Sequence, residues 1–146
     1  MKALEGSNLS HLGRWPVHPQ QARAARRLVH ITPADHLHLI HGRSQHVLVS
    51  VVVSNEHVTL WVLTIPPGGW SEIEAHDGEE ALAVLDGTLV IRTFAPGEER
   101  DTEKTSQLSL TVHRGEKAFL PRGVKHSYKN FGEDVVRAYV AMAPRP

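Results

Sequence analysis

Alternating apolar and polar positions dominate the sequence from residue 46 onward. The segments 46–54 (HVLVSVVVS) and 57–65 (HVTLWVLTI) are rich in β-branched and aromatic residues, which favour extended strands. Only Asn55 and Glu56 separate them, a length typical of a tight hairpin loop. Both faces of the second segment carry apolar side chains, so we expect another layer of structure, or another subunit, on its outer face.

Short strands separated by turn-forming residues continue to the end of the chain. Asp86-Gly87 predicts a two-residue hairpin, and the polar segment 95–106 predicts a solvated loop. In the strand after that loop, Leu108, Leu110 and Val112 alternate with polar residues, which predicts a half-buried strand. The further strands expected are 80–85, 88–94, 117–120, 125–130 and 135–142. Nine or ten short strands and almost no helix predict an all-β sandwich or barrel.

The first part of the chain lacks a sustained period. We predict that residues 1–45 form an N-terminal arm with the first short strands, which packs on a barrel formed by residues 46–146. Helix-favouring residues predict a short helix over 20–27, followed by a short strand over 28–31. Trp15 is expected to dock on its own barrel or on a neighbouring subunit.

Metal-binding side chains gather in the segment 74–80. Glu74 and His76 are two residues apart, so on a strand they share one face. Turn-forming residues follow at Asp77-Gly78, and Glu80 opens the next strand. We expect this strand to lie beside the one that carries Glu74 and His76. These three side chains can therefore converge on one point, and His126 is the downstream residue expected to join them.

The spacing of these residues resembles the two sequence motifs of the cupin superfamily. The first motif, G-x5-H-x-H-x3,4-E-x6-G, is filled by Gly68, Glu74 in place of the first histidine, His76, Glu80 and Gly87. The second motif, G-x5-P-x-G-x2-H-x3-N, is filled by Gly115, Pro121, Gly123, His126 and Asn130. The resemblance covers residues 47–142. It implies a cupin-type double-stranded β-helix, a jelly-roll barrel, with one divalent metal ion held by Glu74, His76, Glu80 and His126.

The type of ligand indicates which ion such a site prefers. Imidazole suits Fe, Ni, Cu and Zn, and carboxylates shift the preference toward Fe or Mn. We therefore expect Fe, Mn, Ni or Zn, with Fe or Mn favoured, and the sequence has no cysteine to attract a softer metal. With Glu74 and Glu80 both ionised, a divalent site is neutral, and bound water is acidified less than at a charged site. This argues against a zinc-hydroxide hydrolase.

Two residues are candidates for catalysis. Glu74 is either a metal ligand or a general base beyond the ligands. Tyr128 lies on the same strand face as His126, where it either donates a proton to the substrate or is a core residue with one hydrogen-bond partner. Asn130 is expected to tie down the following turn.

The histidines His36, His38 and His41 form a second histidine-rich segment. No carboxylate follows at the cupin interval, and Gly42 ends the segment. We therefore interpret it as an edge strand with polar residues facing out, and not as a metal site.

The resemblance implies a metal-dependent enzyme acting on a small organic substrate, and a non-haem Fe(II) or Mn(II) oxygenase-like reaction is the first hypothesis. A redox-neutral cyclase, isomerase or lyase is the second, and a non-catalytic ligand-binding or sensor protein is the third. The 16 basic and 16 acidic residues cancel, so no nucleic-acid footprint is present.

The sequence also bears on location and assembly. It contains no apolar stretch that approaches the ~20 residues of a membrane span. The lack of cysteine fits the cytoplasm. Apolar residues at Val51, Val53 and Trp61, expected to face outward, predict a homodimer.

Overall fold

The computed structural model describes residues 2–4, 26, 28–44 and 46–144, and in these residues it contains ten strands in two sheets. The larger sheet has the order β1 (Lys2–Leu4), β2 (Leu37–His41), β3 (Val47–Ser54), β4 (Thr59–Ile65), β10 (Val136–Ala143), β5 (Glu79–Asp86) and β8 (Lys117–Leu120). The smaller sheet has the order β7 (Leu108–His113), β6 (Thr88–Phe94) and β9 (Lys125–Lys129). One 3₁₀ turn, η2 (Pro33–Asp35), is the helical element of the described chain. The prediction of an all-β fold is confirmed.

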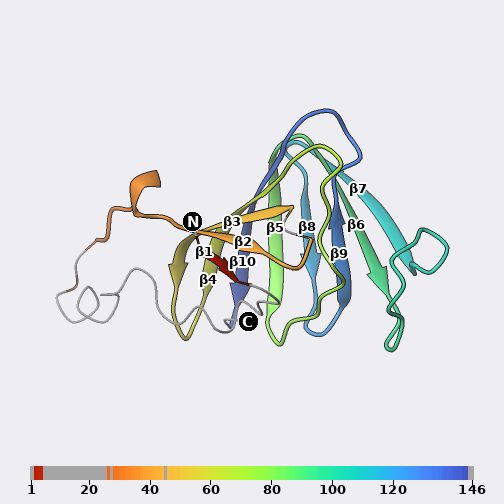
Figure 1. The fold of residues 1–146 in the computed structure, drawn as a ribbon. Coiled ribbons are helices and arrows are strands. Elements are labelled where there is room, and N and C mark those ends of the chain that lie inside the picture. Colours follow the sequence, from red (N-terminus) through yellow and green to blue (C-terminus); the bar gives the residue numbers. More distant parts are fainter. Residues whose placement is uncertain (1, 5–25, 27, 45, 145–146) are drawn as a thin grey trace.

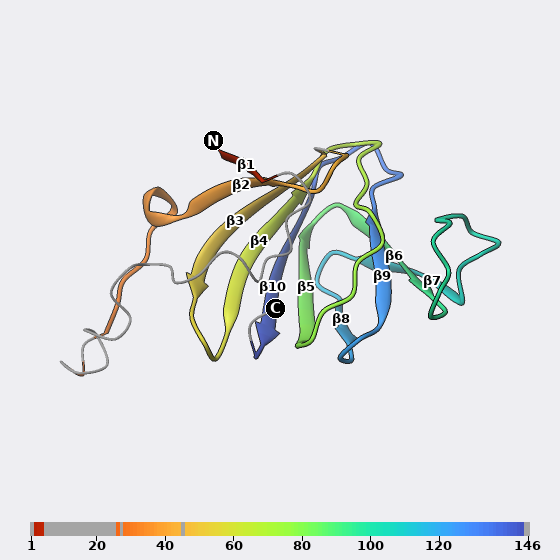
Figure 2. The same cartoon turned by 60° about the horizontal axis from the view of Figure 1, so that its bottom comes forward.

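The smaller sheet lies beside the β5–β8 end of the larger one, as Figures 1 and 2 show from two directions. Apolar side chains of both sheets fill the space between them, including Leu82 and Val84 of β5 and Leu89 and Ile91 of β6. This arrangement is the double-stranded β-helix implied by the sequence motifs. Two polar residues, Glu80 of β5 and His126 of β9, are buried in the same interior.

Gly87 is a corner between the two sheets and not the turn of a hairpin. It alone separates β5 from β6, yet β5 pairs with β10 and β8, whereas β6 pairs with β7 and β9. Its φ is +75°, and a Cβ atom there would lie 2.7 Å from the carbonyl oxygen of Val135. The predicted Asp86-Gly87 hairpin is therefore wrong. A left-handed glycine serves either geometry, and pairing with distant strands decides between them.

The hairpin between β3 and β4 is confirmed, but its loop is longer than predicted. It spans residues 55–58, and the side chain of Asn55 accepts hydrogen bonds from the backbone N–H groups of His57 and Val58, at 2.9 and 3.2 Å. The Asn55 N–H also donates to the carbonyl of Val58 at 3.0 Å. His57 and Val58, which were expected to begin the second strand, therefore belong to an Asx-type turn.

Two other sequence predictions fail. Residues 28–32 have no regular structure, so the predicted strand over 28–31 is wrong. In β7, Val112 is buried, but Leu108 and Leu110 are 55% and 46% exposed, so this strand is less buried than its alternation predicted. The helix predicted over 20–27 lies outside the described residues except for Arg26, and so does Trp15.

Two of the three side chains that suggested a dimer face the barrel interior. Val51 of β3 and Trp61 of β4 are partners in register, and they are 0% and 3% exposed within the apolar core. Val53 is half-buried. The expectation that Val51 and Trp61 face outward is therefore wrong, because the face of β4 that carries Trp61 is the one that packs inside.

The N-terminal region contributes directly to the larger sheet. β2 is antiparallel to β3, from Leu37 opposite Val51 to His41 opposite Val47, and β1 pairs with its other side. β2 is thus no edge strand, contrary to its interpretation from sequence. No helix in the described part of the chain is long and apolar enough to cross a membrane.

Candidate metal site

The segment that carries Glu74 and His76 is extended and attached to β9. Its backbone exchanges hydrogen bonds with β9: Ser71 donates to Tyr128 at 2.9 Å, and Glu74 and His126 donate to each other at 2.8 Å. The pairing is limited to isolated bridges, from Trp70 to Lys129 and from Glu74 to His126. The strand that Glu80 opens, β5, pairs with β10 and β8, so the prediction that it lies beside this segment is wrong. As bridge partners, Glu74 and His126 present their side chains on the same face.

Three of the four predicted ligands come together in the barrel interior. One possible ligand atom from each of His76, Glu80 and His126 lies within 4.8 Å of the others. Oε2 of Glu80 is 3.4 Å from Nε2 of His126 and 3.9 Å from Nε2 of His76. Glu80 and His126 are each 2% exposed. The predicted convergence of these three side chains is thus present in the fold.

The donor atoms of this cluster fit a divalent cation. Within the described structure, Oε2 of Glu80 and Nε2 of His126 are buried and have no hydrogen-bond partner. Leaving such a group unpaired costs about 1–3 kcal/mol. Nδ1 of His126 donates to the carbonyl of Val124 at 2.9 Å, so its Nε2 presents a lone pair to the cluster when the ring is neutral. An ion among these atoms would satisfy both orphaned groups.

Tyr128 orients the carboxylate of Glu80. Its hydroxyl donates a hydrogen bond to Oε1 of Glu80, and its ring lies edge-on to His126 with centroids 5.2 Å apart. Burial raises the pKa of Tyr128 well above its usual value, and the charge of Glu80 raises it further, so the phenol keeps its proton. Because Tyr128 occupies Oε1, the free oxygen of Glu80 is the one that faces both histidines.

Glu74, the fourth predicted ligand, lies beside the cluster. Its Oε2 is 3.4 Å from Nε2 of His76, and its Oε1 is hydrogen-bonded to Nε2 of His41. Burial alone would raise the pKa of Glu74, but hydrogen bonds from His41 and His76 hold it at about 2. Burial likewise lowers the pKa of His41, but the contact with Glu74 raises it above the ordinary value. Glu74 is therefore ionised next to the proposed ligands.

His41 is the residue of this site that the sequence argument missed. It is 6% exposed at the end of β2, on the same strand face as Leu37 and the buried Leu39. His38 lies on the opposite face, where its Nδ1 is 2.8 Å from Oγ of Ser50. The outward orientation predicted for this segment is thus correct for His38 and wrong for His41. The alternation of Leu37, Leu39 and His41 was the available signal.

Asn130 has the structural role expected of it. Its side-chain amide donates to the carbonyls of Ile65 and Asp134, at 3.0 and 2.8 Å, and its Oδ1 accepts from Gly132 at 3.0 Å. It thereby joins the end of β9 to the end of β4 and to the turn before β10.

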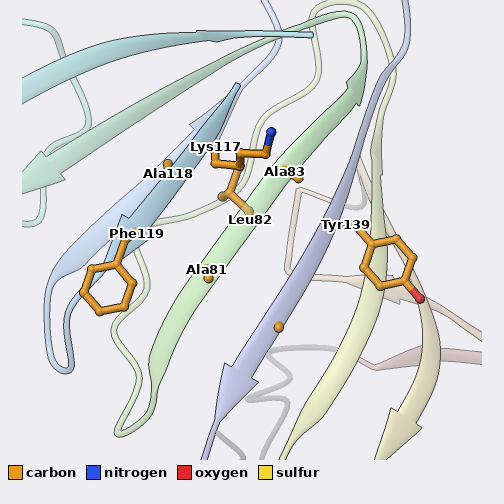
Figure 3. A pocket seen from close by; sticks show the side chains of 8 residues that line it. Ala81, Leu82, Ala83, Lys117, Ala118, Phe119 and Tyr139 are labelled. Atoms are coloured by element: carbon orange, nitrogen blue, oxygen red, sulfur yellow. The ribbon is translucent and has the colours of Figure 1, made fainter. Parts of the chain in front are cut away.

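A groove of about 470 Å³ lies on the outer side of the larger sheet, over β5, β8 and β10 (Figure 3). Its lining residues are Ala81, Leu82, Ala83, Lys117, Ala118, Phe119, Tyr139 and Ala141. This lining contains no imidazole and no carboxylate, so the groove offers no ligands of the kind found at the interior cluster.

The sequence matches the model of one protein family, the cupin domain, over residues 61–142. A comparison with curated protein sequences finds no match. Among solved structures, an RmlC-like cupin from Shewanella frigidimarina superimposes with a TM-score of 0.60 at 11% identity, covering 80% of this chain and 92% of that one.

Two further solved structures are similar over part of their length. The cupin domain of Schizosaccharomyces pombe Cnp3 gives a TM-score of 0.57 at 18% identity, covering 68% of this chain and 65% of that one. An oxalate oxidase in complex with the substrate analogue glycolate gives 0.52 at 22% identity, covering 62% and 43%. The chain thus spans less than two thirds of either protein. At these identities the likeness shows the fold alone.

Proposed function

Because the chain belongs to the cupin family, we propose that it is a metal-dependent enzyme that acts on a small organic substrate, by oxygenase-like chemistry. The observation that carries the proposal is the convergence of His76, Glu80 and His126 inside the barrel, with two buried ligand atoms unpaired. The two atoms lie 3.4 Å apart without a hydrogen bond, whereas buried polar groups of a structural core are as a rule hydrogen-bonded.

Two imidazoles and one carboxylate support Fe(II) or Mn(II) as the ion, ahead of Ni or Zn. Such an ion, when bound, supplies one-electron chemistry and open coordination positions for a substrate and oxygen. The chain's own residues hold the ligands: Tyr128 orients Glu80, and the carbonyl of Val124 sets the tautomer of His126. The charges of Glu74 and Glu80 balance a divalent ion, which favours this chemistry over metal-hydroxide hydrolysis.

The role of Glu74 within this proposal is that of a further ligand or of a base beside the ion. Its low pKa means that it is ionised at neutral pH in either role. Tyr128, with its raised pKa, is a proton donor in hydrogen bonds and not a base. The oxalate oxidase among the similar structures, which binds glycolate, shows that the same fold holds a small organic acid in another protein.

Metal content and oxygen consumption test the proposal together. Protein purified without added metal should contain one Fe or Mn ion per chain, measured by elemental analysis. It should consume oxygen, in an oxygen electrode, with a member of a panel of small organic acids, and His126→Ala should abolish both properties. The control is His113→Ala, at an exposed histidine on β7. Protein that lacks metal and does not take it up on reconstitution contradicts the proposal.

The two other hypotheses give different results in the same assays. A cyclase, isomerase or lyase converts its substrate without consuming oxygen, through polarisation of a carbonyl or enolate. A sensor or ligand-binding protein binds its ligand, which calorimetry detects, but produces no turnover.

A cytoplasmic location and a homodimer also belong to the proposal. Light scattering that gives a particle of 16.2 kDa, the mass of one chain, rules out the dimer.

A further inference from the structure

We propose that His41 is a positioning residue of the metal site: it donates a hydrogen bond from Nε2 to Oε1 of Glu74 and thereby directs Oε2 of Glu74 toward His76 and the ion. His41 precedes the region matched by the family model, which begins at residue 61. The inference rests on the proposed function in two respects: an ion binds at His76, Glu80 and His126, and Glu74 is a further ligand of that ion.

The fold brings His41 to the site by strand pairing. β2 is held in register against β3, with His41 opposite Val47, and alternation turns Leu37, Leu39 and His41 to the barrel interior. Val47 and Leu39 are 1% and 4% exposed, so the strand end that carries His41 is packed into the core. The imidazole therefore reaches Glu74 from a buried and well-fixed backbone.

The turn after β2 is hydrogen-bonded to the segment 70–74, which His41 also contacts through Glu74. The N–H of Ser44 donates to Oε1 of Glu72 at 2.5 Å, and Oγ of Ser44 donates to the carbonyl of Trp70 at 2.8 Å. A Cβ atom on Gly42 would lie 2.2 Å from Oε2 of Glu72, and its φ of +78° also favours glycine. The carboxylate of Glu72 thus fits closely into the turn.

Alternate residues of the segment 70–74 therefore contact the same part of the chain, residues 41–44. Trp70, Glu72 and Glu74 all contact residues 41–44, while the backbone of the same segment bonds to β9 on its other side. Held from both sides, Glu74 has little freedom to rotate its carboxylate. With Oε1 engaged by His41, the oxygen that remains is Oε2, the one 3.4 Å from Nε2 of His76.

This assignment differs from a purely structural role for His41. A buried histidine that only fills space can be replaced by an apolar side chain of similar size without a specific effect on the ion. A positioning histidine must be replaced by another donor of similar reach. Glutamine has an N–H donor at a reach close to that of Nε2 of histidine, leucine has none, and the donor of asparagine falls short.

The experiment uses Co(II) as the probe, with the full-length, metal-stripped protein. Calorimetry gives the affinity for Co(II), and the visible absorption spectrum reports its coordination. His41→Leu should weaken binding by roughly 10–100-fold, as the loss of a partner to a metal ligand does, and change the spectrum. His41→Gln should keep both close to wild type.

His38→Leu, on the opposite face of β2, is the matched control and should have no effect. If His41→Leu does not fold, His41→Asn is used in its place. It should show the same weaker Co(II) binding and changed spectrum that are expected of His41→Leu.

The outcomes separate the inference from the proposed function. If the wild type binds Co(II) and His41→Leu, or His41→Asn in its place, binds it with the same affinity and spectrum, the inference is overturned and the proposed function stands. Failure of His41→Gln to restore the spectrum also overturns it, since the donor would then not be what matters. A wild type that binds no Co(II) overturns both.

Discussion

The hydroxyl of Tyr128 donates a hydrogen bond to Oε1 of Glu80, and both side chains are buried, at 6% and 2% exposure. The two residues lie on different sheets, Tyr128 on β9 and Glu80 on β5. Their contact therefore joins the sheets at the candidate metal site and leaves Oε2 of Glu80 facing both histidines.

Tyr128→Phe should remove this support while keeping the ring against His126. In the metal-free protein, a buried carboxylate oxygen loses its donor, which costs about 1–3 kcal/mol in the free energy of unfolding. Denaturant unfolding of the metal-stripped protein measures this loss. The control is Tyr139→Phe, at the outer groove, which should change stability by less than about 0.5 kcal/mol. Equal stabilities of wild type and Tyr128→Phe would show that the hydrogen bond contributes nothing net.

Substitutions of Glu74 separate its two possible roles. If Glu74 is a ligand, Glu74→Gln should lower metal affinity by roughly 10–100-fold or more, since it removes a charge next to the ion. Glu74→His should retain metal, because the substitution rebuilds the histidine of the motif, but its activity should change with the charge of the site. Metal titrations of the stripped proteins measure the affinities. If Glu74→Gln and wild type bind equally well, Glu74 is not a ligand and acts as a base.

The metal-free protein should be most stable between about pH 4.5 and pH 6.5, the ordinary pKa values of Glu and His. Glu74 has a folded pKa of about 2, so its contribution is present above pH 4.5 and is lost as the pH falls toward 2. The pKa of His126 is raised: burial lowers it, but the contact with Glu80 raises it more. Its contribution is therefore present below pH 6.5 and is lost as the pH rises through the folded value; the raised pKa of His41 acts in the same direction.

Thermal unfolding of the stripped protein over this pH range checks both limbs of the profile. A shift of the Glu74 pKa from 4.5 to about 2 corresponds to about 3 kcal/mol. In Glu74→Gln the acid limb should become shallower by a comparable amount, because no carboxylate at position 74 remains to be protonated. An unchanged acid limb in this variant would assign the acid sensitivity to other carboxylates.

Gly87→Ala tests the corner between the sheets. The added methyl group meets the carbonyl of Val135 at 2.7 Å in a left-handed backbone conformation, so we expect a loss of more than about 2 kcal/mol in unfolding free energy. The control is Gly97→Ala in the 95–106 loop, where φ is +87° and nothing lies within 4 Å. It reports the cost of the backbone conformation alone. Equal losses in the two variants would mean that β5 and β6 separate easily enough to accommodate the methyl group.

Residue identity and spacing alone predicted much of this protein. The resemblance of the two motifs to those of the cupins implied the fold and pointed to His76, Glu80 and His126, whereas strand periodicity by itself placed only Glu74 and His76 on one face. The strands β8 and β9 were predicted to within a residue, since Gly115, Pro121 and Gly123 bound them in sequence. The tie made by Asn130 followed from the same motif.

Tertiary structure decided which strands pair, and the sequence argument failed where pairing mattered. The same Asp86-Gly87 signal serves a hairpin or a sheet corner, and Trp61 has apolar neighbours on either face of its strand, so local pattern left both undetermined. His41 and Glu74 are 33 residues apart, and their contact exists because β2 adds to the sheet beside β3 in one register. Periodicity assigns a side chain to a face of its own strand. The partner it meets there depends on long-range strand order, which burial of the whole core selects.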